Sequence, residues 1–173
     1  MTNSSSLTRR QFLKTGTGAA IAAPTIIPSA ALGQAEKTAP SNRITIGLIG
    51  CGARGMSVMK SFLNERTTQV VAVCDPYKLH HRGKEKGRTF GRKPAAETVG
   101  KKYGTQPCDT YADYRKLCAR KDIDAVIVAT PDHWHAVQAL EALRNGQDVY
   151  CEKPVTHFFA EGKALYREVA KRK

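Results

Sequence analysis

The 173-residue sequence lacks the cysteine patterns that build disulfide frameworks or bind zinc. It contains no CxxC pair, and its cysteines are odd in number: Cys51, Cys74, Cys108, Cys118 and Cys151. Three of them lie on or beside predicted strands, where a free cysteine behaves as a small buried hydrophobic residue. We therefore predict structural cysteines and no disulfide framework.

The histidines lack a zinc-binding spacing as well. His133 and His135 are two residues apart, so they would not share a helix face, and they do not match His-x-x-x-His. His80 and His81 lie in a basic segment instead. The sequence therefore predicts no metal site.

Acidic side chains are scarce, and the formal net charge is +13. Within residues 76–105, many Lys and Arg residues stand against only Glu85 and Glu97. Such a balance is typical of proteins that bind nucleic acid or acidic surfaces. No DNA-binding motif or interleaved aromatic residues accompany it, so we expect no nucleic-acid partner. An acidic partner domain would explain the excess charge equally well.

The first 33 residues contain no acidic side chain at all. Residues 8–14 include the pair Arg9-Arg10, and a weakly apolar stretch rich in Ala, Gly and Thr continues to about residue 32. This pattern is typical of a bacterial twin-arginine (Tat) export signal. Glycines and prolines interrupt the apolar stretch, so we expect no stable membrane anchor.

These features divide the chain into three parts. We assign residues 1–33 to a Tat signal, 34–42 to a polar linker and 43–173 to a folded domain. The Tat machinery is then an expected partner, and the expected destination is the periplasm or another extracytoplasmic space. Cleavage could follow Gly33 or Ala35. A disordered tail with a chance arginine pair is the alternative interpretation.

Strand-like and helix-like segments alternate along the folded domain. Strands are expected at about 43–49, 69–75, 105–109, 125–130 and 148–151, and helices at about 54–65, 95–103, 111–120, 131–144 and at the end of the chain. The apolar, largely β-branched run at 125–130 suits a strand that is buried on both faces of a parallel sheet. The alternation predicts an α/β fold with a doubly wound parallel sheet.

The most informative motif follows the first predicted strand. Gly50-Cys51-Gly52-Ala53-Arg54-Gly55 has the spacing GxGxxG, and Asp75 ends the second predicted strand 20 residues later. In a dinucleotide-binding unit, Gly50 would permit a tight turn, Gly52 the approach of a pyrophosphate, and Gly55 close packing of helix and strand. The N–H groups at the helix start would hold the negative charge. A purely structural glycine turn is the alternative.

Asp75 indicates which dinucleotide would bind. Its carboxylate can accept hydrogen bonds from an adenosine ribose and repels a 2′-phosphate, which favours NAD over NADP. Basic residues in the following loop could offset this preference, so NADP stays possible. Since ligands bind where the strand order of such a sheet reverses, the loops at 50–55 and 130–135 should face one another across the cofactor.

Four motifs together resemble the Gfo/Idh/MocA family of NAD(P)-dependent oxidoreductases, named after glucose–fructose oxidoreductase and inositol dehydrogenase. They are Gly50–Gly55, Asp75-Pro76, Thr130-Pro131-Asp132-His133-Trp134-His135 and Glu152-Lys153-Pro154. The resemblance covers about residues 43–173. It implies a Rossmann NAD(P)-binding fold and hydride transfer between a nicotinamide cofactor and a sugar, polyol or related hydroxyl substrate.

The resemblance also implies a role for individual residues. The implied cofactor contacts are Gly50, Gly52, Arg54 and Gly55 at the pyrophosphate, Asp75 at the adenosine ribose, Thr130, Asp132, Trp134 and His135 at the nicotinamide half, and Glu152 at the nicotinamide ribose. Lys153 is implied to lie between the nicotinamide and the substrate, as a cofactor contact and the catalytic residue.

Lys153 has a physical case of its own. It precedes Pro154, which favours an extended backbone and would keep the lysine at the end of a strand, facing the crevice. We expect a partly buried amine that takes a proton from a substrate hydroxyl while hydride leaves for the cofactor. A solvated surface lysine is the alternative.

The resemblance implies a second domain that this sequence does not contain. Family members carry a C-terminal α+β domain that supplies most of the substrate site and the oligomer interface. The chain ends within a helical pattern at 160–166, so we expect a fragment that is inactive alone and oligomeric only with that domain. Two alternatives stay open: an NAD-dependent glycosidase of the same family that uses transient oxidation, and an inactive dinucleotide-binding product.

Overall fold

The computed structural model describes residues 39–81 and 87–172. The predicted Tat signal, residues 1–33, and the first part of the predicted linker lie outside these residues. The described part begins with a short 3-10 turn, η2 (Pro40–Asn42), which leads directly into the first strand.

The central feature of the described part is a parallel sheet of five strands. Its order is β5-β2-β1-β6-β7, and every neighbouring pair is parallel. The strands are β1 (Ile44–Ile49), β2 (Thr68–Cys74), β5 (Asp109–Tyr111), β6 (Ala125–Val128) and β7 (Asp148–Cys151). The strand order reverses between β1 and β6, which confirms the predicted doubly wound α/β fold.

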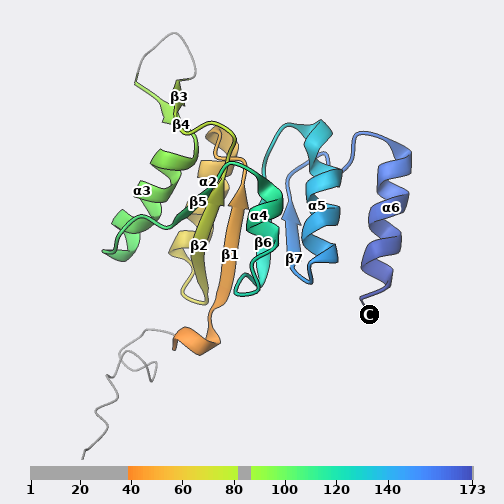
Figure 1. The fold of residues 1–173 in the computed structure, drawn as a ribbon, viewed down its shortest axis with the longest axis horizontal. Coiled ribbons are helices and arrows are strands. Elements are labelled where there is room, and N and C mark those ends of the chain that lie inside the picture. Colours follow the sequence, from red (N-terminus) through yellow and green to blue (C-terminus); the bar gives the residue numbers. More distant parts are fainter. Residues whose placement is uncertain (1–38, 82–86, 173) are drawn as a thin grey trace, which may run out of the picture.

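Helices cover both faces of the sheet (Figure 1). One cluster of buried side chains joins one face to α2 (Ala53–Asn64) and α3 (Arg92–Tyr103). A second cluster joins the opposite face to α4 (Tyr114–Cys118) and α5 (His135–Arg144). The last helix, α6 (Phe159–Ala170), packs against α5 through Leu165.

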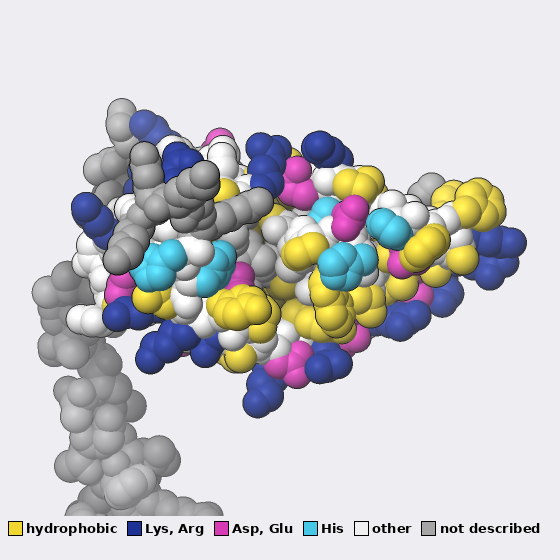
Figure 2. Space-filling model, turned by 90° about the horizontal axis from the view of Figure 1, so that it is seen from above, with side chains coloured by type: hydrophobic (Ala, Val, Ile, Leu, Met, Phe, Trp, Pro, Cys, Tyr) yellow, Lys and Arg dark blue, Asp and Glu magenta, His cyan; other side chains and the backbone are white. Residues whose placement is uncertain are grey.

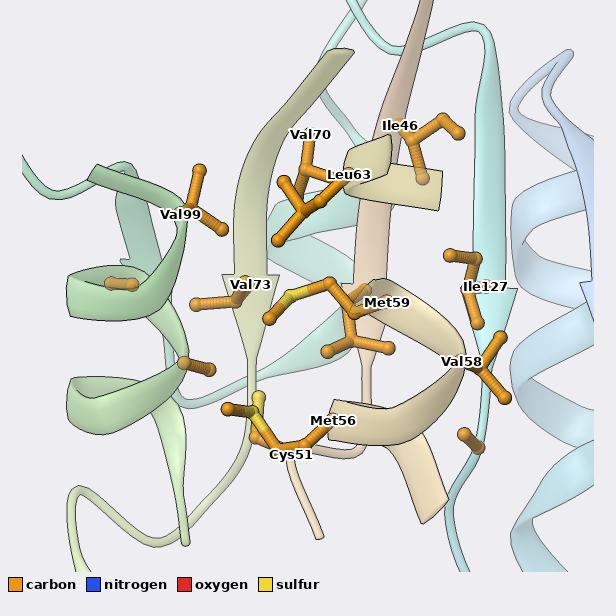
Figure 3. Packing of buried hydrophobic residues seen from close by; sticks show 14 residues of the cluster. Ile46, Cys51, Met56, Val58, Met59, Leu63, Val70, Val73, Val99 and Ile127 are labelled. Atoms are coloured by element: carbon orange, nitrogen blue, oxygen red, sulfur yellow. The ribbon is translucent and has the colours of Figure 1, made fainter. Parts of the chain in front are cut away.

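The core forms because the central strands bury alternate residues on opposite faces. In β6, Ile127 belongs to the cluster under α2, whereas Val126 and Val128 belong to the cluster under α4. Figure 3 shows Met59 and Leu63 of α2 over the side chains of β2. A strand buried on both faces was the expectation for this segment, and it is confirmed.

Several predicted elements differ from the structure. The strand expected at 105–109 forms at Asp109–Tyr111, where it pairs with the end of β2. The helix expected at 111–120 is only Tyr114–Cys118, because Asp113 caps its start by accepting from the Arg115 N–H at 3.0 Å. The helix expected from residue 131 is divided into a 3-10 turn, η3 (Asp132–Trp134), and α5.

The basic segment after β2 contains a feature that the sequence did not predict. Within the described residues, β3 (His80–His81) and β4 (Thr89–Phe90) form a two-stranded antiparallel ribbon. The helix expected at 95–103 begins earlier, at Arg92, directly after this ribbon. Strands of two residues are too short to show the alternation from which a strand is predicted.

The five cysteines all lie within the described residues and are free. Burial raises the pKa of Cys74 and of Cys118 to about 12, and it raises the pKa of Cys51 as well. These thiols stay neutral near pH 7, so they act as small hydrophobic residues rather than as nucleophiles. Among the described helices, none is long and apolar enough to span a bilayer.

Candidate functional site

A cavity of about 850 Å³ opens at the carboxyl ends of the parallel strands. Its walls come from the loops that follow β1, β2, β5 and β6, so the segments 50–55 and 130–135 do face one another. Figure 2 shows this end of the molecule, where hydrophobic side chains and histidines gather around a hollow. The volume is within the range of about 300–1,000 Å³ that small-molecule sites have.

The glycines of the loop after β1 have three different environments. Gly50 has φ 94°, and a Cβ there would lie 2.7 Å from the carbonyl group of Ala129. A Cβ on Gly55 would lie 1.8 Å from the carbonyl oxygen of Gly50, so α2 can only approach β1 this closely without a side chain. Gly52 lines the cavity and has no atom within 4 Å of its Cβ position.

This arrangement fits a bound diphosphate. Gly52 is the N-cap of α2, and because it has no side chain it cannot itself cap the helix. The first N–H groups of a helix have no partner inside the helix, and the helix dipole favours an anion there. A helix start that opens into a cavity through a glycine is therefore suited to hold phosphate groups.

Asp75 lies at the end of β2, on the wall of the same cavity. Its side chain is buried, with 7% exposed. One carboxylate oxygen accepts from the Cys51 N–H at 2.9 Å and the other from the Tyr77 N–H at 2.8 Å. Each oxygen keeps a further lone pair for a ribose hydroxyl. The bond to Cys51 is a second role, which the sequence analysis missed.

The loop after β6 forms the opposite wall. Thr130 lines the cavity, and its hydroxyl donates to the Gln138 side chain at 2.8 Å. Trp134 also lines the cavity; it is 46% exposed and meets the ring of Tyr114 edge-on, with ring centres 6.4 Å apart. This wall therefore combines an aromatic surface with a polar group, as a nicotinamide ring and its amide require.

Two residues of the same loop lie away from the cavity wall. Asp132 accepts from the His133 N–H at 2.9 Å, and this bond lowers the pKa of its carboxyl group. His135 is only 1% exposed. Its Nε2 lies 2.8 Å from the carbonyl oxygen of Thr130 and its Nδ1 lies 2.7 Å from that of Pro154. The ring thus connects the loop after β6 with the loop after β7, beneath the site.

An ion pair connects the glycine loop with the end of β7. Arg54 Nη2 lies 2.8 Å from Glu152 Oε1. The arginine side chain is largely exposed and lines the cavity, whereas the glutamate is buried. The hydrogen bond and charge of Arg54 lower the pKa of Glu152. Two residues that the sequence placed at different parts of a cofactor are therefore in direct contact.

Lys153 does not have the expected environment. The sequence analysis predicted a partly buried amine, and this is wrong for the described part of the chain, where Lys153 is exposed. The lysine follows the last residue of the edge strand β7 and a buried Glu152, and a cis peptide bond joins it to Pro154. Because it lies beyond the end of the sheet, no layer of described residues covers it.

Further residues at this site were not indicated by the sequence. Tyr114 and Arg115 of α4 line the cavity, and Arg92 binds the turn that carries Asp75. No local motif marks them, because the fold alone brings them to the loops. Within residues 39–81 and 87–172, no group of three or more His, Cys, Asp or Glu side chains could hold a metal ion.

Comparison with known protein families identifies the family of this chain. The model of the oxidoreductase family with an NAD-binding Rossmann fold matches residues 44–173. The chain belongs to this family, Gfo/Idh/MocA. The NAD-binding Rossmann domain expected from the four motifs is thereby confirmed, and the cavity lies where that domain binds its cofactor.

Curated relatives of this chain include glycosidases. A glycosyl hydrolase family 109 protein of Stenotrophomonas maltophilia is 35% identical over 83% of this chain, which spans 29% of that relative. An alpha-N-acetylgalactosaminidase of Shewanella oneidensis is 30% identical over 65% of this chain, which spans 23% of it. The chain therefore spans less than a third of these relatives.

Solved structures similar to this chain include dehydrogenases and a ketoreductase. The myo-inositol dehydrogenase of Lactobacillus casei, in complex with NAD(H) and myo-inositol, has a TM-score of 0.59 and 25% identity over 75% of this chain. A 3-ketoreductase from Actinomadura kijaniata, in complex with TDP-benzene and NADP, has a TM-score of 0.58 and 26% identity over 76% of this chain. This chain covers 34% and 36% of those proteins.

The ion pair between Arg54 and Glu152 gives a testable titration. The pKa of Glu152 lies below its ordinary value of 4.5, so the pair stabilises the fold above that pH and is lost as the pH falls through the lowered pKa. Arg54→Met should raise the pKa of Glu152 toward the ordinary value. NMR titration of the Glu152 carboxyl carbon measures the change.

Asp113 is the internal control for that titration. Its pKa is also lowered, in this case by Arg115, and Arg54→Met should leave it unchanged. An unchanged Glu152 titration in Arg54→Met would show that the two side chains do not pair in solution.

Proposed function

We propose that this chain is the cofactor-binding part of an exported enzyme that transfers hydride between NAD and a hydroxyl-bearing carbon of a sugar or polyol. The observation that carries the proposal is the glycine cradle that opens into the cavity at Gly52, with Asp75 on the same wall. The dehydrogenase of Lactobacillus casei, whose structure contains NAD(H) and myo-inositol, supports the substrate class.

The residues of this chain divide the work of holding the cofactor. Gly52 and the start of α2 receive the diphosphate, and Asp75 accepts hydrogen bonds from the adenosine ribose. Thr130 and Trp134 line the nicotinamide half, and the Arg54–Glu152 pair joins the glycine loop to the end of β7. The bound nicotinamide ring supplies the hydride acceptor.

Lys153 is the proposed general base. Its amine, when neutral, takes the proton of the substrate hydroxyl as hydride leaves the carbon that bears this hydroxyl. In this chain the lysine is exposed, so the groups that surround a substrate there would come from outside residues 1–173. The substrate itself is therefore proposed only as a class, a sugar, polyol or related hydroxyl compound.

The cofactor assignment predicts NAD binding by this chain. Calorimetric titration of the purified chain should show saturable binding of NAD that is tighter than binding of NADP. Asp75→Ala should weaken NAD binding by about tenfold or more, the usual effect of losing hydrogen bonds to a charged acceptor. Asp148→Ala is the matched control, because this exposed carboxylate lies at the opposite end of the sheet.

Circular dichroism must show that each variant is folded before the titrations are compared. A folded wild-type chain that binds neither nucleotide would refute the cofactor assignment.

A glycosidase is the second candidate, favoured by the family 109 relatives. Such an enzyme would oxidise its sugar transiently, eliminate the leaving group, add water in its place and return the hydride, so it would form no net NADH. A dehydrogenase would accumulate NADH. An inactive dinucleotide-binding product is the remaining candidate. The calorimetric titration with NAD and NADP distinguishes it from a chain that binds neither nucleotide.

We expect this chain alone to perform neither reaction, since most contacts to a substrate would lie outside it. Absorbance at the NADH band, with sugars and polyols, and release of nitrophenol from nitrophenyl glycosides measure the two activities. Steady turnover in either assay would contradict the expectation, and the assay that responds would identify the reaction.

We also propose that residues 1–33 direct export by the Tat route, through Arg9-Arg10. Residues 1–35, fused to a folded reporter in a bacterium with an active Tat system, should carry the reporter to the periplasm. Replacing both arginines by lysine keeps the charge and should abolish export, whereas Lys14→Arg should not. Export that persists with the paired lysines would contradict the twin-arginine assignment.

A further inference from the structure

Arg92 lies at the start of α3, behind the turn that carries Asp75. Its Nη1 donates to the carbonyl oxygen of Asp75 at 2.9 Å and to that of Pro76 at 2.8 Å. The side chain does not line the cavity. Its guanidinium group therefore binds the backbone of the turn and does not contact the cavity.

The backbone at the start of α3 is bound to the same turn. The N–H of Arg92 donates to the carbonyl oxygen of Tyr77 at 3.1 Å, and that of Lys93 to the carbonyl oxygen of Lys78 at 3.0 Å. These N–H groups have no partner inside the helix. The first turn of α3 is thus hydrogen-bonded to the turn after β2, and these bonds fix the two segments relative to each other.

Gly91 extends this contact to the glycine loop. Its N–H donates to the carbonyl oxygen of Cys51 at 3.1 Å, while the N–H of Cys51 donates to the Asp75 carboxylate at 2.9 Å. Gly91 has φ 112°, and a Cβ there would lie 2.8 Å from the carbonyl oxygen of Tyr77. The contact therefore needs a glycine before Arg92.

These bonds form a closed network around Asp75. Its backbone carbonyl is held by Arg92, its carboxylate is joined to the loop of Cys51, and that loop is joined to Gly91. A carboxylate fixed in this way presents the same oxygen positions to every ligand. Preorganised acceptors bind more tightly because they lose little freedom on binding.

We propose that Arg92 is a positioning residue that determines selectivity for NAD over NADP. It acts through the backbone of Asp75: by binding the carbonyl oxygens of Asp75 and Pro76 it fixes the turn from which the carboxylate projects, so that a ribose 2′-hydroxyl is accepted and a 2′-phosphate is repelled. The proposal rests on the proposed function, that is, on dinucleotide binding in this cavity. It assigns to the NAD site a residue that does not itself line the cavity.

The first test compares NAD and NADP affinities of Arg92→Met with those of the wild-type chain, by calorimetry. We expect NAD binding to weaken by about tenfold, since the turn that carries Asp75 is no longer held in place and the carboxylate must be ordered when NAD binds. NADP binding should weaken less, because loosening Asp75 also removes a repulsion. The ratio of NAD affinity to NADP affinity should therefore fall.

Two matched variants accompany this comparison. Lys93→Met removes the same charge from the neighbouring residue, whose exposed side chain pairs with Glu97, and it should keep the wild-type ratio. Arg92→Lys keeps a charged donor and should give an intermediate ratio; it carries the test if Arg92→Met does not fold.

A double-mutant cycle with Asp75→Ala separates positioning from general stabilisation. In the Asp75→Ala background, Arg92→Met should change NAD affinity by less than about twofold, because the group through which it acts is gone. Equal weakening of NAD and NADP by Arg92→Met, or full additivity in the cycle, would overturn the proposal.

Failure of the proposed function gives a different result. A wild-type chain that binds neither nucleotide would refute dinucleotide binding, and the Arg92 proposal with it. A wild-type chain that prefers NAD, together with an Arg92→Met variant that keeps this preference, would refute only the role of Arg92.

Discussion

The hydrogen bond from the Cys51 N–H to the buried Asp75 carboxylate is the contact on which the site depends. It joins the ends of β1 and β2, the two strands that carry the glycine cradle and Asp75. A buried carboxylate is costly unless hydrogen bonds satisfy it, so this acid requires the loop to keep its shape. The loop, in turn, has glycines because the chain at Gly50 and Gly55 leaves no room for side chains.

The same principle organises the other side of the cavity. His135 connects the loops after β6 and β7 through two backbone carbonyl oxygens, and the Arg54–Glu152 pair connects the end of β7 with the glycine loop. The loop after β7 is thus joined by side chains to the loop after β6 and to the glycine loop after β1, two strands away in the sheet. The cavity is formed by loops that are held from several directions, which suits a cofactor that must be bound along its whole length.

Much of the fold and part of the site could be predicted because their signals are local. The strands β1, β2, β6 and β7 coincide with apolar runs in the sequence, and the glycine motif with Asp75 lies within one strand–helix–strand unit. The β3–β4 ribbon, the position of β5 and the role of Arg92 could not be predicted. The strands of the ribbon have only two residues each, too few to show a pattern. The position of β5 and the contacts of Arg92 depend on hydrogen bonds to segments distant in sequence, such as those from Arg92 to the turn at Asp75. The exposure of Lys153 was missed for a related reason, because burial depends on what packs over a strand end.

The docking of α3 onto the turn after β2 has a consequence for how this domain tolerates change. Backbone hydrogen bonds fix 75–78 at one end and 91–93 at the other. These bonds therefore do not depend on the length of chain between the two points, of which His80 lines the cavity and Phe90 packs against the core. Doubling the length of a loop costs only about 0.6 kcal/mol, so sequence changes that keep His80 and Phe90 are open to evolution and to protein engineering without displacing Asp75.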